Sequence, residues 1–171
     1  MADSTLEFDE SGSSSSSQQR LDIVRVIAVL KRGIESRDAN EIEDAVLSAF
    51  EIGLRPEFVP LFIRLLDLAG HHQHEDVVLA LQELKDASAV NSLYNAAFVK
   101  HDYLAYDELF GLARKCTWAL ADIGTADALA KLRLMASSEN RLIAVYAQKR
   151  IDNWDDEIVR KGSHKRSPPK K

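Results

Sequence analysis

Residues 116–132 read CTWALADIGTADALAKL, which is the pattern of one helix, a tight turn and a second helix that folds back. The turn contains Gly124, the residue type best suited to the left-handed conformation that ends many helices. Weaker copies of the pattern lie at residues 49–61 and 80–93. Repetition of a helical hairpin predicts an all-α fold, since no stretch alternates with period two for long enough to form a strand.

The copies align on a small residue in the first helix of each hairpin. Ala49, Ala80 and Ala119 align, and a truncated fourth copy has Ala147, so successive alanines are 31, 39 and 28 residues apart. Two-helix units of this period are typical of α-solenoids, in which stacked hairpins bury the apolar faces that one hairpin cannot bury alone. The large apolar residues that align are Phe50, Leu81 and Leu120, then Phe58, Val90 and Leu129, and finally Leu61, Leu93 and Leu132.

The chain of 171 residues suits one domain, and we expect this domain to be the solenoid over residues 20–157. Residues 1–19 are acidic and rich in serine, and we expect them to be disordered; weak docking through Leu6 and Phe8 is the alternative. Residues 158–171 form a basic tail that we also expect to be disordered; binding of this tail to nucleic acid or to an anionic membrane is the alternative.

Eight helices are expected between Arg20 and Trp154. Asn40 is the expected N-cap of the second helix, with Glu43 in the capping-box position three residues later. Pro56 is expected to open the third helix, because proline is favoured at the first helical position.

The charge distribution limits the kind of partner. The chain has a formal net charge of −5, and residues 20–159 hold 16 basic and 23 acidic residues. An acidic body argues against a nucleic-acid groove, whose affinity comes mainly from neutralising phosphates, and it favours a basic protein partner. No apolar run is long enough to span a membrane, and the N-terminus lacks the pattern of a secretion signal, so we expect a soluble cytoplasmic protein with no membrane partner.

The segment ALADIGTADALAKL at residues 119–132 resembles the short HEAT repeats of the phycobiliprotein-lyase-like type. FVPL at residues 58–61 resembles the Val-Pro-x-Leu segment of the same repeat. The resemblance covers roughly residues 40–155 and implies an α-solenoid of about four repeats with a right-handed superhelix. Most HEAT proteins are binding scaffolds and a few subfamilies are enzymes, so the resemblance implies a fold rather than an activity.

A histidine-rich segment raises the question of a metal site. His74-Glu75, which follows His71 and His72, resembles the His-Glu pairs with which the HEAT-repeat deoxyhypusine hydroxylases bind two irons. That family needs several such pairs, and the aligned positions here are Glu43-Asp44, Ala113-Arg114 and Arg141-Leu142. We therefore expect an ordinary exposed loop, with metal binding by the loop as the alternative.

The other residues with chemical potential have structural interpretations. Cys116 aligns with Val46 and Val77, which predicts a buried position in the core, and as the only cysteine it cannot form an internal disulfide. His101 and Asp107 lie near each other in the sequence, but no spacing joins them to a third group. We assign no catalytic residue, no cofactor and no metal ligand.

One row of residues lies outside the expected core. It comprises the residue before each aligned alanine, namely Ser48, Leu79, Trp118 and Tyr146. In HEAT solenoids this face is usually the concave one, and large apolar side chains there suit a protein-binding hot spot. The alternative is that Trp118 and Tyr146 pack between neighbouring units. The acidic residues Asp44, Glu75, Glu83 and Asp122 flank the row as a rim for a basic partner or, alternatively, as a solvated face.

These observations predict a non-enzymatic protein-binding module that uses its inner helices. Small size and acidic charge favour an inhibitor or an immunity-type protein that blocks a basic partner. The alternative is a HEAT-repeat enzyme or cofactor handler of the phycobiliprotein-lyase type, which would hold a tetrapyrrole. The oligomeric state stays open.

Overall fold

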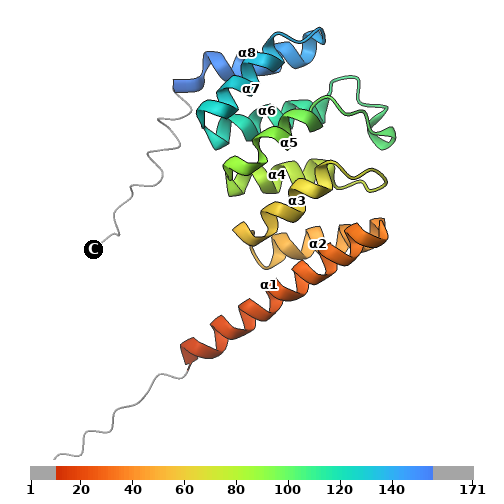
Figure 1. The fold of residues 1–171 in the computed structure, drawn as a ribbon, viewed down its shortest axis with the longest axis vertical. Coiled ribbons are helices and arrows are strands. Elements are labelled where there is room, and N and C mark those ends of the chain that lie inside the picture. Colours follow the sequence, from red (N-terminus) through yellow and green to blue (C-terminus); the bar gives the residue numbers. More distant parts are fainter. Residues whose placement is uncertain (1–10, 156–171) are drawn as a thin grey trace, which may run out of the picture.

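A computed structural model describes residues 11–155 of the chain, and Figure 1 shows that they form a stack of helices. The all-α prediction is confirmed, and this part of the chain contains no strand. No helix in it has the length and apolar character needed to cross a membrane. The helices are α1 (Ser11–Ser36), α2 (Ala39–Glu51), α3 (Val59–Leu66), α4 (His74–Leu84), α5 (Val90–Ala96), α6 (Gly111–Ile123), α7 (Ala126–Ala136) and α8 (Arg141–Asp152), with 3-10 turns at Pro56–Phe58, Ala87–Ala89 and Asp102–Leu104.

The helices form two layers. One layer contains α2, α4, α6 and α8, and each of these helices packs against the next (Figure 1). The other layer contains α1, α3, α5 and α7, which pack against one another in the same order. Contacts between α1 and α2, α3 and α4, α5 and α6, and α7 and α8 join the layers. This order is the one expected for stacked hairpins. The assignment to HEAT repeats, the number of repeats and the handedness of a superhelix stay predictions.

The aligned alanines lie in the core of the stack. Ala49, Ala80, Ala119 and Ala147 are each 0% exposed. A methyl side chain lets neighbouring helices approach closely, which explains why the repeated pattern has a small residue at this position. The predicted core position of Cys116 is confirmed, because its thiol is buried and burial raises its pKa. A buried thiol with a raised pKa is a packing residue rather than a nucleophile.

The turns follow the pattern of the repeated unit. Gly53 follows α2 with a φ of +87°, and Gly124 ends α6 with a φ of +68° while its N–H donates to the Leu120 carbonyl over 3.2 Å. Lys85 occupies the corresponding position after α4 with a φ of +54°, although it is not a glycine. The hairpin geometry therefore imposes the left-handed conformation even where the sequence gives no glycine.

The first helix is longer than expected. It begins at Ser11 rather than at Arg20, so residues 11–19 are helical although the sequence predicted disorder there. Gln18 Nε2 donates to Asp22 Oδ1 over 3.0 Å, an i, i+4 contact of the kind that extends a helix beyond its packed part. The expectations for residues 1–10 and for the tail from residue 156 lie outside the described residues.

The N-cap of α2 is Asp38, and the prediction of Asn40 was wrong. The Asp38 carboxylate accepts hydrogen bonds from the N–H groups of Asn40 and Glu41, at 2.9 and 3.2 Å. Asp38 and Asn40 are both favoured cap residues, and the extended backbone of Asp38 decides between them.

We expect Asp38→Ala to lower the free energy of unfolding by about 1 kcal/mol, because two N–H groups of the first helical turn lose their acceptor. Asn40→Ala is the matched control and should change the free energy by a few tenths of a kcal/mol, roughly the effect of an ordinary surface substitution. Urea unfolding followed by circular dichroism measures both. Equal losses in the two variants would contradict the assignment of the cap.

Candidate protein-interaction site

The row of residues outside the core lies on the layer formed by α2, α4, α6 and α8. Leu79 on α4 is 41% exposed and Trp118 on α6 is 37% exposed, whereas Ser48 on α2 and Tyr146 on α8 are half-buried. Single exposed apolar side chains are ordinary on protein surfaces, so the question is which members of the row a partner could reach. Leu79 and Trp118 are the members of the row most accessible to one.

Trp118 is both packed and accessible. The interpretation as an exposed binding residue and the interpretation as a residue packed between units therefore each describe part of it. The guanidinium carbon of Arg150 on α8 lies 3.6 Å from the centroid of the indole ring, a cation–π contact. Arg150 is itself only 5% exposed. A cation held at this distance in a buried position fixes the orientation of the indole, while more than a third of the Trp118 surface still faces solvent.

Tyr146 is fixed by a hydrogen bond to a distant part of the chain. Its hydroxyl group donates to the carbonyl oxygen of Leu109 over 2.8 Å, which joins α8 to the loop before α6. Leu109 is 65% exposed and Val145, the neighbour of Tyr146, is 54% exposed. Exposed apolar side chains therefore lie both on α8 and on the loop that Tyr146 joins to it.

Trp118 and Tyr146 line a common cavity, which we call the α6–α8 cavity. Its volume is about 320 Å³. Among the residues that the structure describes, its lining has three cationic side chains and no carboxylate, and its principal lining residues are Arg114, Trp118, Val145, Tyr146, Lys149 and Arg150. The structure thus brings two of the predicted residues together and adds cations that the sequence analysis missed.

A signal for these cations is present in the sequence. Arg114 precedes Trp118 by four residues, Lys149 follows Val145 by four, and Arg150 follows Tyr146 by four. Residues four apart lie on the same face of a helix, so each of these cations shares a face with a residue lining the cavity.

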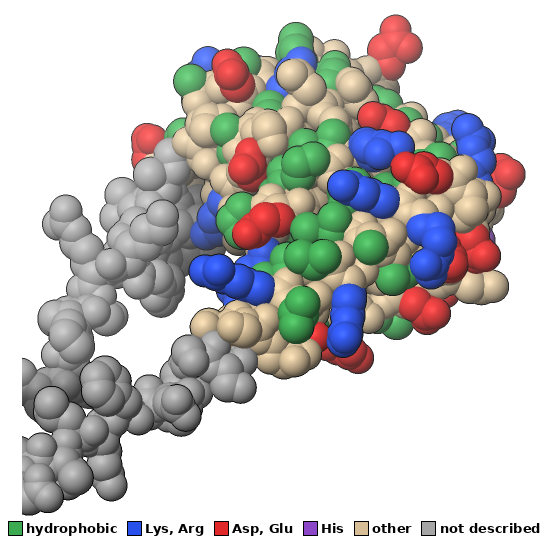
Figure 2. Space-filling view, turned by 60° about the horizontal axis from the view of Figure 1, so that its bottom comes forward, with side chains coloured by type: hydrophobic (Ala, Val, Ile, Leu, Met, Phe, Trp, Pro, Cys, Tyr) green, Lys and Arg blue, Asp and Glu red, His purple; other side chains and the backbone are tan. Residues whose placement is uncertain are grey.

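The predicted acidic rim is divided among separate contacts. Glu75 Oε1 lies 3.4 Å from Lys115 Nζ, and Asp122 accepts a hydrogen bond from Gln82 over 2.7 Å, so both join α4 to α6. Asp44 lines a different cavity, between α1 and α2, and Glu83 is exposed. None of these acids lines the α6–α8 cavity. Figure 2 shows a face on which acidic and basic side chains alternate around apolar ones, so the net charge does not describe each surface.

The histidine-rich segment is mostly buried, and the prediction of an exposed loop was wrong. His71 is 1% and His74 is 0% exposed, and only His72 lies on the surface. The His74 ring centroid lies 4.0 Å from that of His71 and 3.7 Å from that of His101. The loop that carries His101 projects from the same edge of the stack as the loop of His71 and covers it (Figure 1).

Hydrogen bonds hold His71 and His74 as neutral rings. In His71, Nε2–H donates to the Leu65 carbonyl (2.9 Å) and Nδ1 accepts from the Gln73 N–H (3.1 Å). In His74, Nε2–H donates to the Leu68 carbonyl (3.0 Å) and Nδ1 faces the Tyr103 hydroxyl (3.1 Å). Burial lowers the pKa of His71, and burial together with the neighbouring histidines lowers that of His74 to about 3.

These bonds leave no ring nitrogen of His71 or His74 for a metal ion. The residues that the structure describes contain no group of three His, Cys, Asp or Glu side chains arranged to hold one. The cluster is a packed and hydrogen-bonded part of the fold. Its bonds to Leu65, Leu68 and Tyr103 tie the turn and the start of α4 to the end of α3 and to the loop after α5.

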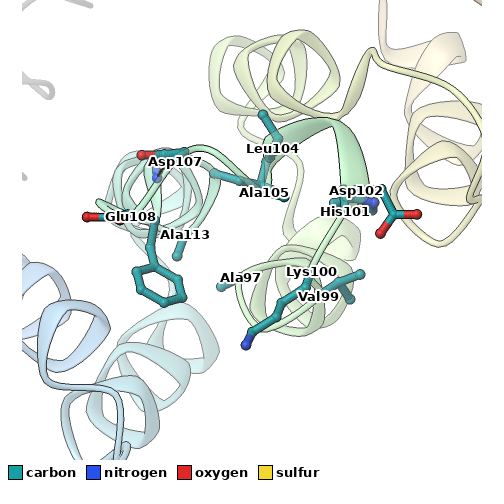
Figure 3. Close-up of a pocket in the computed structure, with 13 residues that line it drawn as sticks. Ala97, Val99, Lys100, His101, Asp102, Leu104, Ala105, Asp107, Glu108 and Ala113 are labelled. Carbon is teal, nitrogen blue, oxygen red and sulfur yellow. Dashed lines mark hydrogen bonds between the residues drawn. The ribbon is translucent and has the colours of Figure 1, made fainter.

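His101 and Asp107 line a second cavity, of about 420 Å³, formed by residues 97–113 (Figure 3). The Asp107 carboxylate accepts hydrogen bonds from the N–H groups of Leu109 (3.0 Å) and Gly111, and therefore caps α6. The side chain of Asp102 points away from the cavity in Figure 3. The structure thus brings His101 and Asp107 to one cavity, but capping occupies the carboxylate that a general base would need.

Comparison with known proteins gives no match, whether with protein-family models, with curated proteins or with solved structures. The resemblance to HEAT repeats therefore rests on the sequence pattern quoted above.

Proposed function

We propose that this protein is a non-enzymatic binding module that attaches to another protein through α4, α6 and α8. The observation that carries the proposal is the state of Trp118, which is 37% exposed and has its ring fixed by Arg150. Tryptophan is enriched among residues that dominate binding energies. A ring already fixed in the free protein also loses little conformational freedom on binding, which favours affinity.

The surroundings of Trp118 support an interface rather than a single exposed side chain. Leu79, Val145 and Leu109 are 41%, 54% and 65% exposed and come from α4, α8 and the loop before α6. An interface needs a central anchor with further apolar contacts around it, and these elements supply both. A more specific form of this proposal is an inhibitor or immunity-type protein, which the small size of the chain favours.

We expect the double substitution Trp118→Ala with Tyr146→Ala to weaken partner binding by about 30-fold or more, since hot-spot side chains contribute about 2 kcal/mol or more. The measurement is affinity capture from lysate with the full chain, followed by titration of each captured protein against the variant. Leu134→Ala is the matched control, because Leu134 is 55% exposed but lies on α7 in the other layer.

Circular dichroism of each variant separates loss of the interface from loss of the fold. If the folded double variant retains every captured partner at unchanged affinity, the proposed binding surface is wrong.

A further inference from the structure

We propose that the α6–α8 cavity binds an acidic segment of the protein partner that also carries an apolar side chain. In this arrangement, carboxylates of the segment contact Arg114 and Lys149, and its apolar side chain packs against Trp118 and Val145. The inference rests on the proposed function and specifies the chemistry of the partner. It replaces the expectation, drawn from net charge, of a basic partner at this part of the surface.

The charge of the cavity lining is the first argument. The cavity between α1 and α2 has Arg25 and Arg32, but Glu41 and Asp44 line it too, and Arg32 pairs with Glu41 over 2.7 Å. The cavity of residues 97–113 has one lysine beside three acidic residues. Within residues 11–155, the lining of the α6–α8 cavity has three cations and no acid. Of these three cavities, it alone has a lining that favours a negatively charged ligand.

The different positions of the three cations are the second argument. Arg150 is buried against the indole and orients Trp118. Arg114 and Lys149 are exposed, one on α6 and one on α8, and both line the cavity. A carboxylate placed between these helices meets a guanidinium group from one and an ammonium group from the other. Charge-assisted hydrogen bonds of this kind are stronger than those between neutral groups.

The apolar part of the lining distinguishes a protein segment from other anions. Trp118 and Val145 expose 37% and 54% of their surfaces beside the cations. A free inorganic anion would leave these surfaces in water, whereas an acidic segment with an aromatic or aliphatic residue covers both. A volume of about 320 Å³ accommodates only a short segment. Extended nucleic acid is disfavoured because residues 20–159 carry seven more acidic than basic residues.

The test uses the full chain and the fluorescein-labelled peptide Glu-Glu-Phe-Glu-Glu, with Gln-Gln-Phe-Gln-Gln as its uncharged counterpart. We expect the acidic peptide to bind, as measured by fluorescence anisotropy, and to bind more weakly as salt is added. The double variant Arg114→Gln with Lys149→Gln should bind it at least tenfold more weakly. The matched control is Arg64→Gln with Arg133→Gln, which removes the same charge from exposed positions on α3 and α7 and should leave the affinity unchanged.

Three results would overturn the inference. They are absence of binding by the acidic peptide, equal affinity for the uncharged peptide, and equal loss of affinity in both double variants. If a ten-nucleotide single-stranded DNA binds more tightly than the acidic peptide and is lost in Arg114→Gln with Lys149→Gln, the cavity is assigned to nucleic acid instead.

The same variants separate this inference from the proposed function. If a captured partner is lost by Trp118→Ala but retained by Arg114→Gln with Lys149→Gln, the protein is a binding module and the acidic-segment inference is wrong. If Trp118→Ala with Tyr146→Ala retains every captured partner at unchanged affinity, the proposed function itself fails, whatever the peptide does.

Discussion

Acidification from pH 7 to pH 4 is expected to lower the free energy of unfolding by about 3 kcal/mol through His74 alone. Burial, reinforced by the neighbouring His71 and His101, lowers the pKa of His74 to about 3. The unfolded chain exposes the same ring to water, where its pKa is about 6.5.

The sign follows from which state binds the proton. Below pH 6.5 the unfolded chain protonates His74 while the folded chain does not until about pH 3, so protons stabilise the unfolded state over this range. Above pH 6.5 both states are neutral and the contribution is constant. The pKa values of His71 and His101 are also lowered, mainly by burial, and act in the same direction. In His101, Nε2 is buried and has no hydrogen-bond partner among the residues that the structure describes.

Urea unfolding of the wild type and of His74→Gln at pH 7, 5 and 4 measures this effect. The variant should be less stable than the wild type at pH 7, because the stacked ring is lost, but its stability should fall by about 3 kcal/mol less on going to pH 4. His72→Gln is the control, since His72 is exposed. The comparison between variants removes the contribution of the carboxylates, which titrate in all of them. An identical decline in the wild type and His74→Gln would rule out a buried neutral His74.

The second large effect is expected at the centre of the stack. Leu120→Ala should lower the free energy of unfolding by about 3 kcal/mol, within the range of roughly 2–5 for deletion of a buried leucine side chain. Leu120 is 0% exposed and belongs to α6, which packs against α4, α5, α7 and α8. A void at this position therefore removes contacts from both layers.

Leu134→Ala is the matched control for Leu120→Ala. Leu134 is 55% exposed on α7, so its truncation should cost less than about 1 kcal/mol. Thermal unfolding monitored by circular dichroism, together with urea titration, compares the two. Similar losses in the two variants would mean that the aligned residues Phe50, Leu81 and Leu120 do not form the core of the fold.

The sequence predicts the fold well because the relevant signals are local. The four aligned alanines and Cys116 are all buried, as expected for residues that occupy core positions in the repeated two-helix pattern. Gly124 adopts the left-handed conformation of a helix end. Pro56, which was expected to open the third helix, instead opens a 3-10 turn, and α3 itself begins at Val59. Each of these features depends on residues within a few positions in the chain.

The histidine cluster is not predictable in this way, because its burial depends on a distant loop. Tyr103, which faces His74, lies 29 residues further along the chain. A polar run such as Gly70-His71-His72-Gln73 has the composition of an exposed turn until that loop covers it. Similarly, the contact of Arg150 with Trp118 joins two helices, and composition alone assigns an arginine to the surface.

The packing of α4, α6 and α8 in series has a mechanical consequence. Each of these helices packs against the next, so small movements between neighbours can add up along the layer. A partner lying across Leu79, Trp118 and Tyr146 would contact α4, α6 and α8 at once and would restrict their movement relative to one another. The occupied protein would then be stiffer along the axis of the stack than the free protein, and the shape of the partner would set its curvature.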